Sequence, residues 1–154
     1  MGRINQVYST LRTVIPLITG FSTKKELPIP ESLEDNNSNL LKDGWGIIVG
    51  ASNPFQSQEM CYSMDEVQFS IVITKESFNS IADPSKAVST NDTLLQNMND
   101  LRVRLLDSDK LGIPNYLDMV TFTGASGIEF SKSDKYNIRA ITVNFNFLIT
   151  EALG

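Results

Sequence analysis

The 154-residue sequence contains no histidine and a single cysteine, Cys61. Histidine is the commonest general base and transition-metal ligand, so its absence removes Ser-His-Asp and Cys-His catalysis and the usual zinc sites. One cysteine cannot form an internal disulfide, which excludes a disulfide-stapled secreted scaffold. The sequence therefore predicts no catalytic, cofactor-binding or metal-binding residues, and we expect a protein that is not an enzyme.

Basic residues and long apolar runs are also scarce. The 13 Lys and Arg stand against 18 Asp and Glu, and the net charge of -5 argues against a surface that holds nucleic acid by its phosphates. No run approaches the roughly 18 apolar residues of a membrane span. The N-terminal MGRINQVYSTLR has no apolar core of signal-peptide length. We expect no membrane contact and a cytosolic protein, or one assembled in the cytosol.

Short polar motifs that could hold a ligand have simpler interpretations. Asp107 and Asp109 could offer carboxylates to Mg²⁺ or Ca²⁺, but they are more simply the solvated end of a helix. The glycine-rich residues 124–127 lie between two strand segments, so we interpret them as a bulge and not as a phosphate cradle. Four carboxylates could pair as acid and base but are more simply a solvated acidic loop: Glu26, Glu31, Glu34 and Asp35.

Two segments have helical periodicity. Residues 3–19 space apolar side chains as a helix does, and Pro16 should kink or end it before a cap at Gly20. A second helix is predicted at about residues 90–108, capped by Ser89 or Thr90. Asn97 is expected on its outward side. The buried stripe is expected to be Leu94, Leu95, Met98, Leu101, Leu105 and Leu106.

Four segments have the composition or alternation of strands. Residues 44–52 and 66–76 should form an antiparallel hairpin, and residues 116–130 and the alternating C-terminal segment should add two strands. The chain is therefore predicted to be one α+β domain, residues 1–154, in the order α-β-β-α-β-β. Its mostly antiparallel sheet, of four strands or slightly more, should be covered on one face by two helices. Residues 20–44 are predicted to be a long loop.

The hairpin should carry a long arm between its strands, at residues 53–65. As a plain solvent loop this arm would be unusual, because it holds four large apolar side chains. Either they form an interface with another chain, or they fold back on their own core; the sequence leaves both open. These residues are Phe55, Met60, Tyr62 and Met64.

The last strand has an uncharged second side. Its apolar side, Ile141 through Ile149 at alternate positions, should pack under the helices, while Thr142, Asn144 and Asn146 point the other way. This second side would face a neighbouring subunit or a channel, or it is an ordinary solvent-facing sheet surface. A buried charge there would be costly without a partner.

The order of these elements resembles that of the tail terminator (tail completion) proteins of long-tailed bacteriophages. The resemblance covers nearly the whole chain and rests on size, acidity and the segments GWGIIVGAS, EVQFSIVITKE, STNDTLLQNMNDLRVRLL and NIRAITVNFNFLIT. It implies a hexameric ring that caps the tail tube, ends tube polymerisation and meets the head connector. The implied partners are copies of the chain, tail-tube protein and neck protein, and the genome passes through the ring without specific binding. The implied location is the virion, at the junction of head and tail.

Two other functions remain open from the sequence. The chain could instead be a head-to-tail connector, neck or minor tail protein, which would contact the head adaptor. It could also be a small monomeric binding domain. In that case the 52–65 arm and the 20–44 loop would close over a peptide or small ligand.

Overall fold

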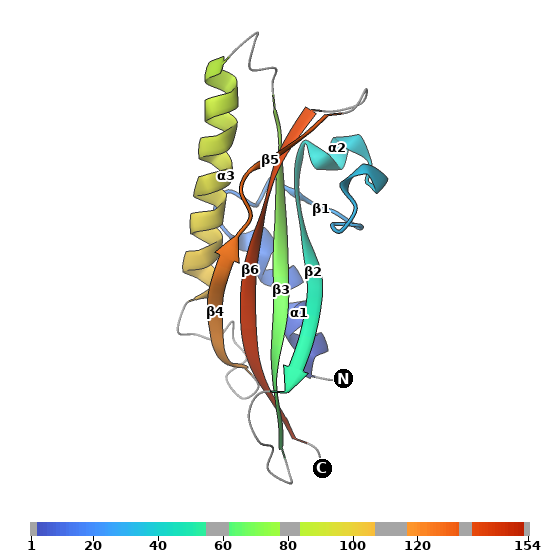
Figure 1. The fold of residues 1–154 in the computed structure, drawn as a ribbon, viewed down its shortest axis with the longest axis vertical. Helices are drawn as coiled ribbons and strands as arrows, with labels where there is room; N and C mark the ends of the chain where they lie inside the picture. Colours follow the sequence, from blue (N-terminus) through green and yellow to red (C-terminus); the bar gives the residue numbers. More distant parts are fainter. Residues whose placement is uncertain (1–2, 55–61, 78–83, 107–116, 133–136, 153–154) are drawn as a thin grey trace.

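The computed structural model describes residues 3–54, 62–77, 84–106, 117–132 and 137–152 (Figure 1). The α+β class predicted from the sequence is confirmed. The elements, in chain order, are α1 (Arg3–Val14), the 3₁₀ turn η1 (Ile15–Leu17), β1 (Lys25–Glu26), the 3₁₀ turn η2 (Leu33–Asp35), α2 (Ser38–Leu41), β2 (Asp43–Pro54), β3 (Tyr62–Glu76), α3 (Pro84–Leu105), β4 (Leu117–Ala125), β5 (Glu129–Lys132) and β6 (Asn137–Ala152).

The strands form one six-stranded sheet in the order β1-β2-β3-β6-β4, with β5 also paired to β6. The predicted hairpin is present, since β2 and β3 pair antiparallel from Asp43↔Lys75 to Pro54↔Asp65. The sheet is mixed, because β1 runs parallel to β2. The prediction of one strand at residues 116–130 was wrong. The register slips between Phe122 and Gly124, where Gly124 has φ 134°, and the segment divides into β4 and β5 at the predicted bulge.

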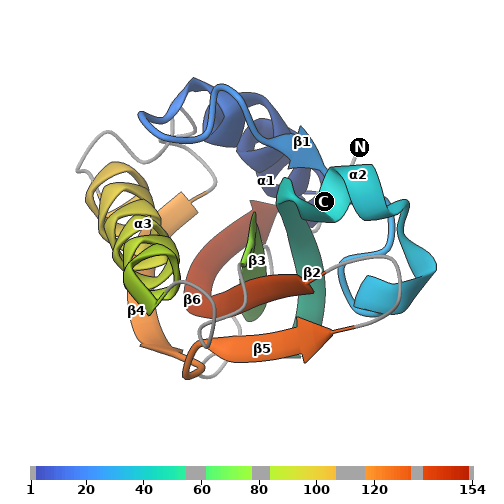
Figure 2. The same cartoon turned by 90° about the horizontal axis from the view of Figure 1, so that it is seen from above.

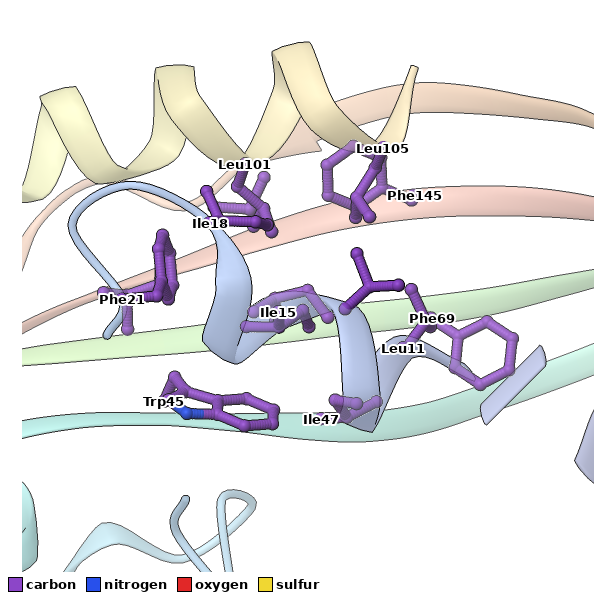
Figure 3. Close-up of a cluster of buried hydrophobic side chains, with 14 of the residues drawn as sticks. Leu11, Ile15, Ile18, Phe21, Trp45, Ile47, Phe69, Leu101, Leu105 and Phe145 are labelled. Carbon is purple, nitrogen blue, oxygen red and sulfur yellow. The ribbon is translucent and has the colours of Figure 1, made fainter. Parts of the chain in front are cut away.

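One face of the sheet is covered by α1, η1 and α3 (Figures 1 and 2). The apolar alternation of β3 and β6 points into this layer, as predicted. Phe69 and Phe145 are fully buried there beside Leu11, Ile15 and Leu101 (Figure 3). The rings of Phe69 and Phe147 meet edge to face at 5.0 Å between centroids. Burial of these alternate residues fixes which side of each strand faces the helices.

The first helix ends just before Pro16, as the sequence predicted. α1 stops at Val14, and Pro16 occupies an early position of η1, where its missing N–H costs nothing. The predicted cap at Gly20 was wrong, because the C-cap of η1 is Ile18. Gly20 lies beyond it and turns the chain with φ 89°. A Cβ at Gly20 would lie 2.8 Å from the side-chain oxygen of Asn97, so α3 closely approaches this turn.

The prediction for α3 was wrong at its start. The helix begins at Pro84, a residue suited to a first helical position. The predicted caps Ser89 and Thr90 lie inside it. The hydroxyl of Thr90 donates to the carbonyl of Lys86 at 3.0 Å, and that of Thr93 to the carbonyl of Ser89 at 3.0 Å. These bonds to the preceding turn satisfy the hydroxyls of Thr90 and Thr93 within the helix.

Part of the predicted buried stripe of α3 was also wrong. Leu94, Leu101 and Leu105 are buried, but Leu95 is 45% exposed and Leu106 41% exposed. Asn97, predicted to face outward, is only 3% exposed, because α3 is turned towards the chain at Gly20. The helix carries apolar residues on more than one side, so its own periodicity did not define the buried face.

The second face of the sheet is covered at one end only. Residues 24–42, predicted to be a loop, contain β1, η2 and α2, and they pass around the edge of β2 (Figure 2). Leu27 and Leu41 pack there on Ile138 of β6. A Cβ at Gly46 would lie 2.5 Å from Cβ of Pro30, so glycine is what lets this segment lie against β2. The rest of the second face has no such cover among the described residues.

Candidate functional site

The uncovered part of the second face carries a polar strip, formed by Glu66, Gln68 and Ser70 of β3 and Thr142, Asn144 and Asn146 of β6. Register places the two sets side by side, with Ser70 opposite Asn144 and Gln68 opposite Asn146. The three β6 side chains point away from the helices and are half-buried. The structure thus brings the three predicted β6 residues together with three from β3.

Cross-strand hydrogen bonds hold the strip in place. The Ser70 hydroxyl donates to Oδ1 of Asn144 at 2.6 Å, and Nδ2 of Asn146 donates to Oε1 of Glu66 at 2.7 Å. Thr142 is held through its backbone, whose N–H donates to the Ser126 hydroxyl at 3.0 Å. The strip is therefore an ordered amide and hydroxyl surface with a single carboxylate.

The sheet has two lateral edges, one formed by β1 and β2 and the other by β4. β1 pairs with only Gly44 and Trp45 of β2, and the Leu27 N–H donates to the Trp45 carbonyl at 2.7 Å. Pro28 has no N–H to continue this pairing. Along an antiparallel strand, every second residue directs its backbone N–H and C=O towards the same neighbour. After Trp45, the residues whose backbone groups point away from β3 are therefore Ile47 and Val49. No strand in the described ranges pairs with that side of residues 46–54, and β4 pairs only with β6.

A cavity of about 580 Å³ lies beside the open edge of β2. Its lining includes Tyr8, Pro30 and Val49. One wall is closed by an ion pair in which Arg12 donates to Glu26 through Nε, at 2.6 Å, and through Nη2, at 3.0 Å. An extended segment could reach the outward backbone groups of β2 from this cavity.

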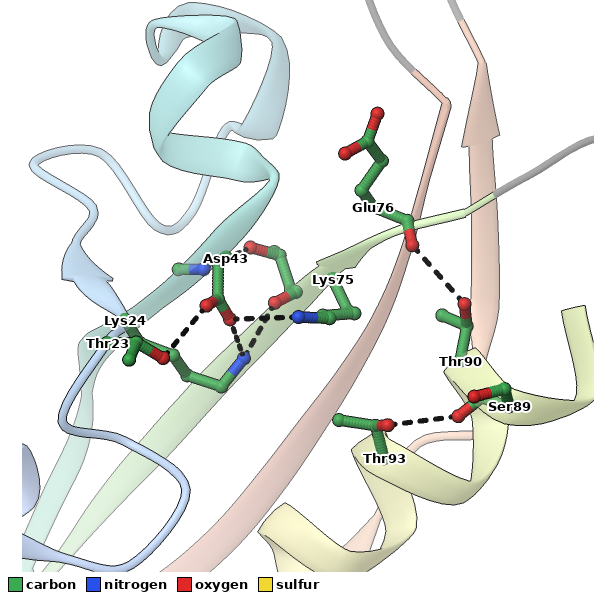
Figure 4. A network of polar contacts seen from close by, with 10 residues as sticks. Thr23, Lys24, Asp43, Lys75, Glu76, Ser89, Thr90 and Thr93 are labelled. Carbon is green, nitrogen blue, oxygen red and sulfur yellow. Dashed lines mark hydrogen bonds and ion pairs between the residues drawn. The ribbon is translucent and has the colours of Figure 1, made fainter. Parts of the chain in front are cut away.

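A second cavity, of about 410 Å³, separates α3 from the adjoining ends of β2 and β3. We call it the lysine cavity, because Lys42, Lys75 and Lys86 line it together with two carboxylates and three hydroxyls. The other lining residues are Asp43, Glu76, Ser89, Thr90 and Thr93 (Figure 4). No sequence pattern predicted this cavity, since its lysines come from three separate segments.

A buried lysine lies beside this cavity. Nζ of Lys24 donates to Oδ1 of Asp43 at 2.7 Å and to the Thr74 carbonyl at 3.0 Å. Burial lowers the pKa of Lys24, and the bond to Asp43 opposes that change. Burial raises the pKa of Asp43, but the hydrogen bond from Lys24 and the charges of Lys24 and Lys75 outweigh it, so the pKa of Asp43 is lowered. The pair ties residues 24–42, which we call the wrapping segment, to β2 and β3.

The predicted arm is shorter than expected, because β2 extends to Pro54 and β3 begins at Tyr62. Phe55 and Met60 lie outside the described residues, as does the side chain of Tyr62. Met64 is half-buried and is paired with Thr150 in register. The interface assigned to these four residues stays a prediction.

Within the described ranges, no three His, Cys, Asp or Glu side chains are grouped so that they could hold a metal ion. Asp107 and Asp109 are not among those residues. In the same part of the chain, no helix has the length and apolarity needed to cross a membrane.

The comparisons with known proteins include a likeness to a solved structure. No protein family matches the sequence, and no curated protein matches it. The chain is similar to a chain of a solved structure described as "Virion of native gene transfer agent (GTA) particle", with 14% sequence identity and a TM-score of 0.42. The match covers 94% of this chain and 92% of the other.

Proposed function

We propose that this chain is a structural virion protein, without catalytic activity, that forms a ring at the head–tail junction of a long-tailed bacteriophage. In this role it ends polymerisation of the tail tube and joins the tail to the head connector. The observation that carries the proposal is the sheet itself. It has an open strand edge at each side, and between them lies the polar strip, whose single carboxylate is that of Glu66. The element order that resembles tail terminators supports the same role.

The open edges favour self-association of one kind. An exposed strand edge pairs readily with other chains, so proteins usually cover or blunt it. Here β2 and β4 lie at opposite sides of the sheet and belong to the same chain. A contact between two different sides repeats from copy to copy, and it closes into a ring when the rotation permits. A ring would cover the edges of every copy.

The polar strip suits a wall past which DNA must move. Lysine or arginine at these positions would bind phosphates and hold the genome. Asn144 and Asn146 carry no charge, and the one ionisable side chain of the strip is the carboxylate Glu66. Across a narrow channel the repulsion between carboxylates and phosphates is only partly screened, since the Debye length is about 8 Å at physiological salt.

Electron microscopy of the purified protein, alone and mixed with tail-tube protein from the same phage, tests this proposal. We expect rings with a central hole, and caps at one end of short tubes. Binding to the head adaptor without binding to tube protein would instead identify a neck protein. A stable monomer that ignores both partners would contradict a ring and favour the small binding domain.

A further inference from the structure

We propose that neighbouring copies in this ring are joined by strand pairing, in which the open stretch of β2, residues 46–54, pairs antiparallel with β4 of the next copy. The inference rests on the proposed ring and names the two strands that meet, their relative direction and the residues that lie opposite each other. The occupant is a second copy of this chain, because its two open edges agree in level, direction, backbone orientation and side-chain character.

The two open stretches lie at the same level of the sheet. In Figure 1 the lower part of β2 and the whole of β4 lie at opposite sides of the molecule and at similar height. Above this level, β1 covers the edge of β2 at Gly44 and Trp45. Copies placed side by side in the same orientation therefore bring one open stretch against the other. The pairings followed from strand to strand place these residues in common rows: Ile47 with Ala125, Val49 with Phe122, and Pro54 with Leu117.

The directions of the two strands suit this contact. β2 is antiparallel to β3, β3 to β6, and β6 to β4, so β2 and β4 run in opposite directions within one chain. Copies related by rotation about an axis along the strands keep these directions. The β2 strand of one copy would therefore meet β4 of the next in the antiparallel geometry that already joins the long strands of this sheet.

The backbone groups of the two edges point outward at matching positions. The alternation that turns Val49 away from β3, followed through β3 and β6, turns Val120 and Phe122 away from β6. The backbone of Thr142 agrees with this alternation, because its N–H and its carbonyl both bond Ser126 on the β4 side. Val49 and Phe122 of neighbouring copies could thus exchange two hydrogen bonds. A shift from Phe122 to Val120 keeps the match and supplies the stagger that a closed sheet needs.

The side chains of the two edges are also compatible. Val49 is paired with a buried residue of β3 on the helix face, and it is 49% exposed. Val120 and Phe122 face the same layer and are only partly buried. Paired edges would bring these apolar side chains together and reduce their exposure. Residues 46–54 carry no charge and β4 carries only Asp118, whereas lone edge strands are usually protected by charged side chains.

Both edges are held in position before any contact. On β2, Ile47 is 8% exposed and belongs to the core, and the cavity of about 580 Å³ beside it leaves space along the strand. On β4, the ring of Phe122 meets that of Phe145 edge to face at 5.8 Å between centroids. The guanidinium carbon of Arg102 lies 3.9 Å from the centroid of the Phe122 ring. Little ordering entropy would therefore be lost when the strands pair.

Hydrogen exchange of the wild-type protein tests the pairing without any substitution. Amide exchange is compared between assembled rings and subunits dissociated by dilution, using mass spectrometry with residue-level fragmentation. We expect the amides of Val49 and Phe122 to exchange about tenfold or more slowly in the ring, because each gains a hydrogen-bond acceptor. The amides of Ile48 and Thr121 point into the sheet, so they should be protected in both states and serve as the internal reference.

A proline substitution tests the same hydrogen bond by assembly. Val49→Pro removes an N–H that points away from β3, a position where an edge strand tolerates proline. Val49→Thr keeps the N–H and is the matched control. Sedimentation velocity should show that Val49→Pro associates about tenfold more weakly than the wild type, and Val49→Thr within about threefold of it. Circular dichroism should show both variants folded.

The outcomes separate the strand pairing from the ring itself. Rings in which the amides of Val49 and Phe122 exchange as fast as in dissociated subunits would overturn the pairing and leave the proposed ring intact. A folded Val49→Pro variant that assembles as well as Val49→Thr would do the same. A wild type that stays monomeric at all concentrations, with or without tail-tube protein, would overturn both.

Discussion

The two faces of the sheet differ in how completely this chain covers them. On the helix face, alternate residues of β3 and β6 are buried under α1 and α3, and the exposed fraction of Val67, Phe69, Val143, Phe145 and Phe147 is 0%. On the second face, residues 27–41 cover one end. At the other end the side chains of the polar strip are half-buried, except that of Ser70, which is 8% exposed. A face that needs no partner is apolar and sealed. The second face is neither, which is why we place the contacts with other molecules there and at the edges beside it.

The largest expected effect is on the sealed face. Phe69→Ala should lower the free energy of unfolding by about 3–5 kcal/mol, because it removes a fully buried ring and leaves a cavity. Gln68→Ala, the next residue on the opposite face, should cost less than about 1 kcal/mol. Urea unfolding followed by circular dichroism measures both. Similar losses for the two variants would mean that the faces do not differ as described.

A glycine substitution tests the covered end of the second face. Gly46→Ala should cost about 1–3 kcal/mol, because its Cβ would lie 2.5 Å from the Cβ of Pro30 and displace the wrapping segment. Gly127→Ala is the matched control, since a Cβ there would have no atom within 4 Å. The midpoints of thermal unfolding give the comparison. A Gly46→Ala variant as stable as the control would show that the segment yields easily.

The ion pair that anchors the wrapping segment should depend on pH. Because the folded-state pKa of Asp43 is lowered, its contribution is present above the unfolded pKa and is lost as pH falls through the folded value. Unfolded Asp titrates at about 3.9, so the stability gap between wild type and Asp43→Asn should be constant near neutral pH. It should shrink below about pH 4. A gap that is unchanged down to pH 2 would contradict the assignment.

The size of the stability difference between wild type and Asp43→Asn depends on Lys24, whose charge stays buried when the carboxylate is removed. Asp43→Asn should cost about 1–3 kcal/mol at pH 7, because the charge of buried Lys24 loses its carboxylate. Lys24→Met, which replaces the buried ammonium with an apolar side chain of similar length, should cost less. Chemical unfolding of both variants at pH 7 orders the two losses.

The smallest effect on stability is expected in the amide strip, together with the clearest effect on function. Asn144→Lys combined with Asn146→Lys should change the unfolding free energy by only about 1 kcal/mol, because both side chains are half-buried at the surface. If the strip faces the DNA channel, the added cations should slow or block genome passage. Infectivity of a phage that carries the variant measures this, with Asn144→Gln as the uncharged control. Full infectivity of the lysine variant would contradict a channel-facing strip.

Much of the fold could be predicted because local patterns and burial agreed. The alternation in β3 and β6 and the helix-ending position of Pro16 each made a prediction that the structure confirms. The start of α3 could not be predicted, because Pro84 and the hydroxyls of the STNDT segment are compatible with either a loop or a helix. Of the candidate surfaces, the sequence placed Thr142, Asn144 and Asn146 together. It did not show their β3 neighbours or the lysine cavity.

The sequence by itself determined which side of each long strand is apolar, and therefore that one face of the sheet must be sealed by helices. It also determined that histidine-dependent chemistry is absent, which composition alone can establish. Only the tertiary structure decided which face of α3 is buried, how residues 24–42 pass around β2, and which distant lysines share a cavity. The physical reason is that the periodicity of a segment shows only which of its own faces is apolar. Contacts between segments far apart in the chain depend on packing, which no local pattern contains.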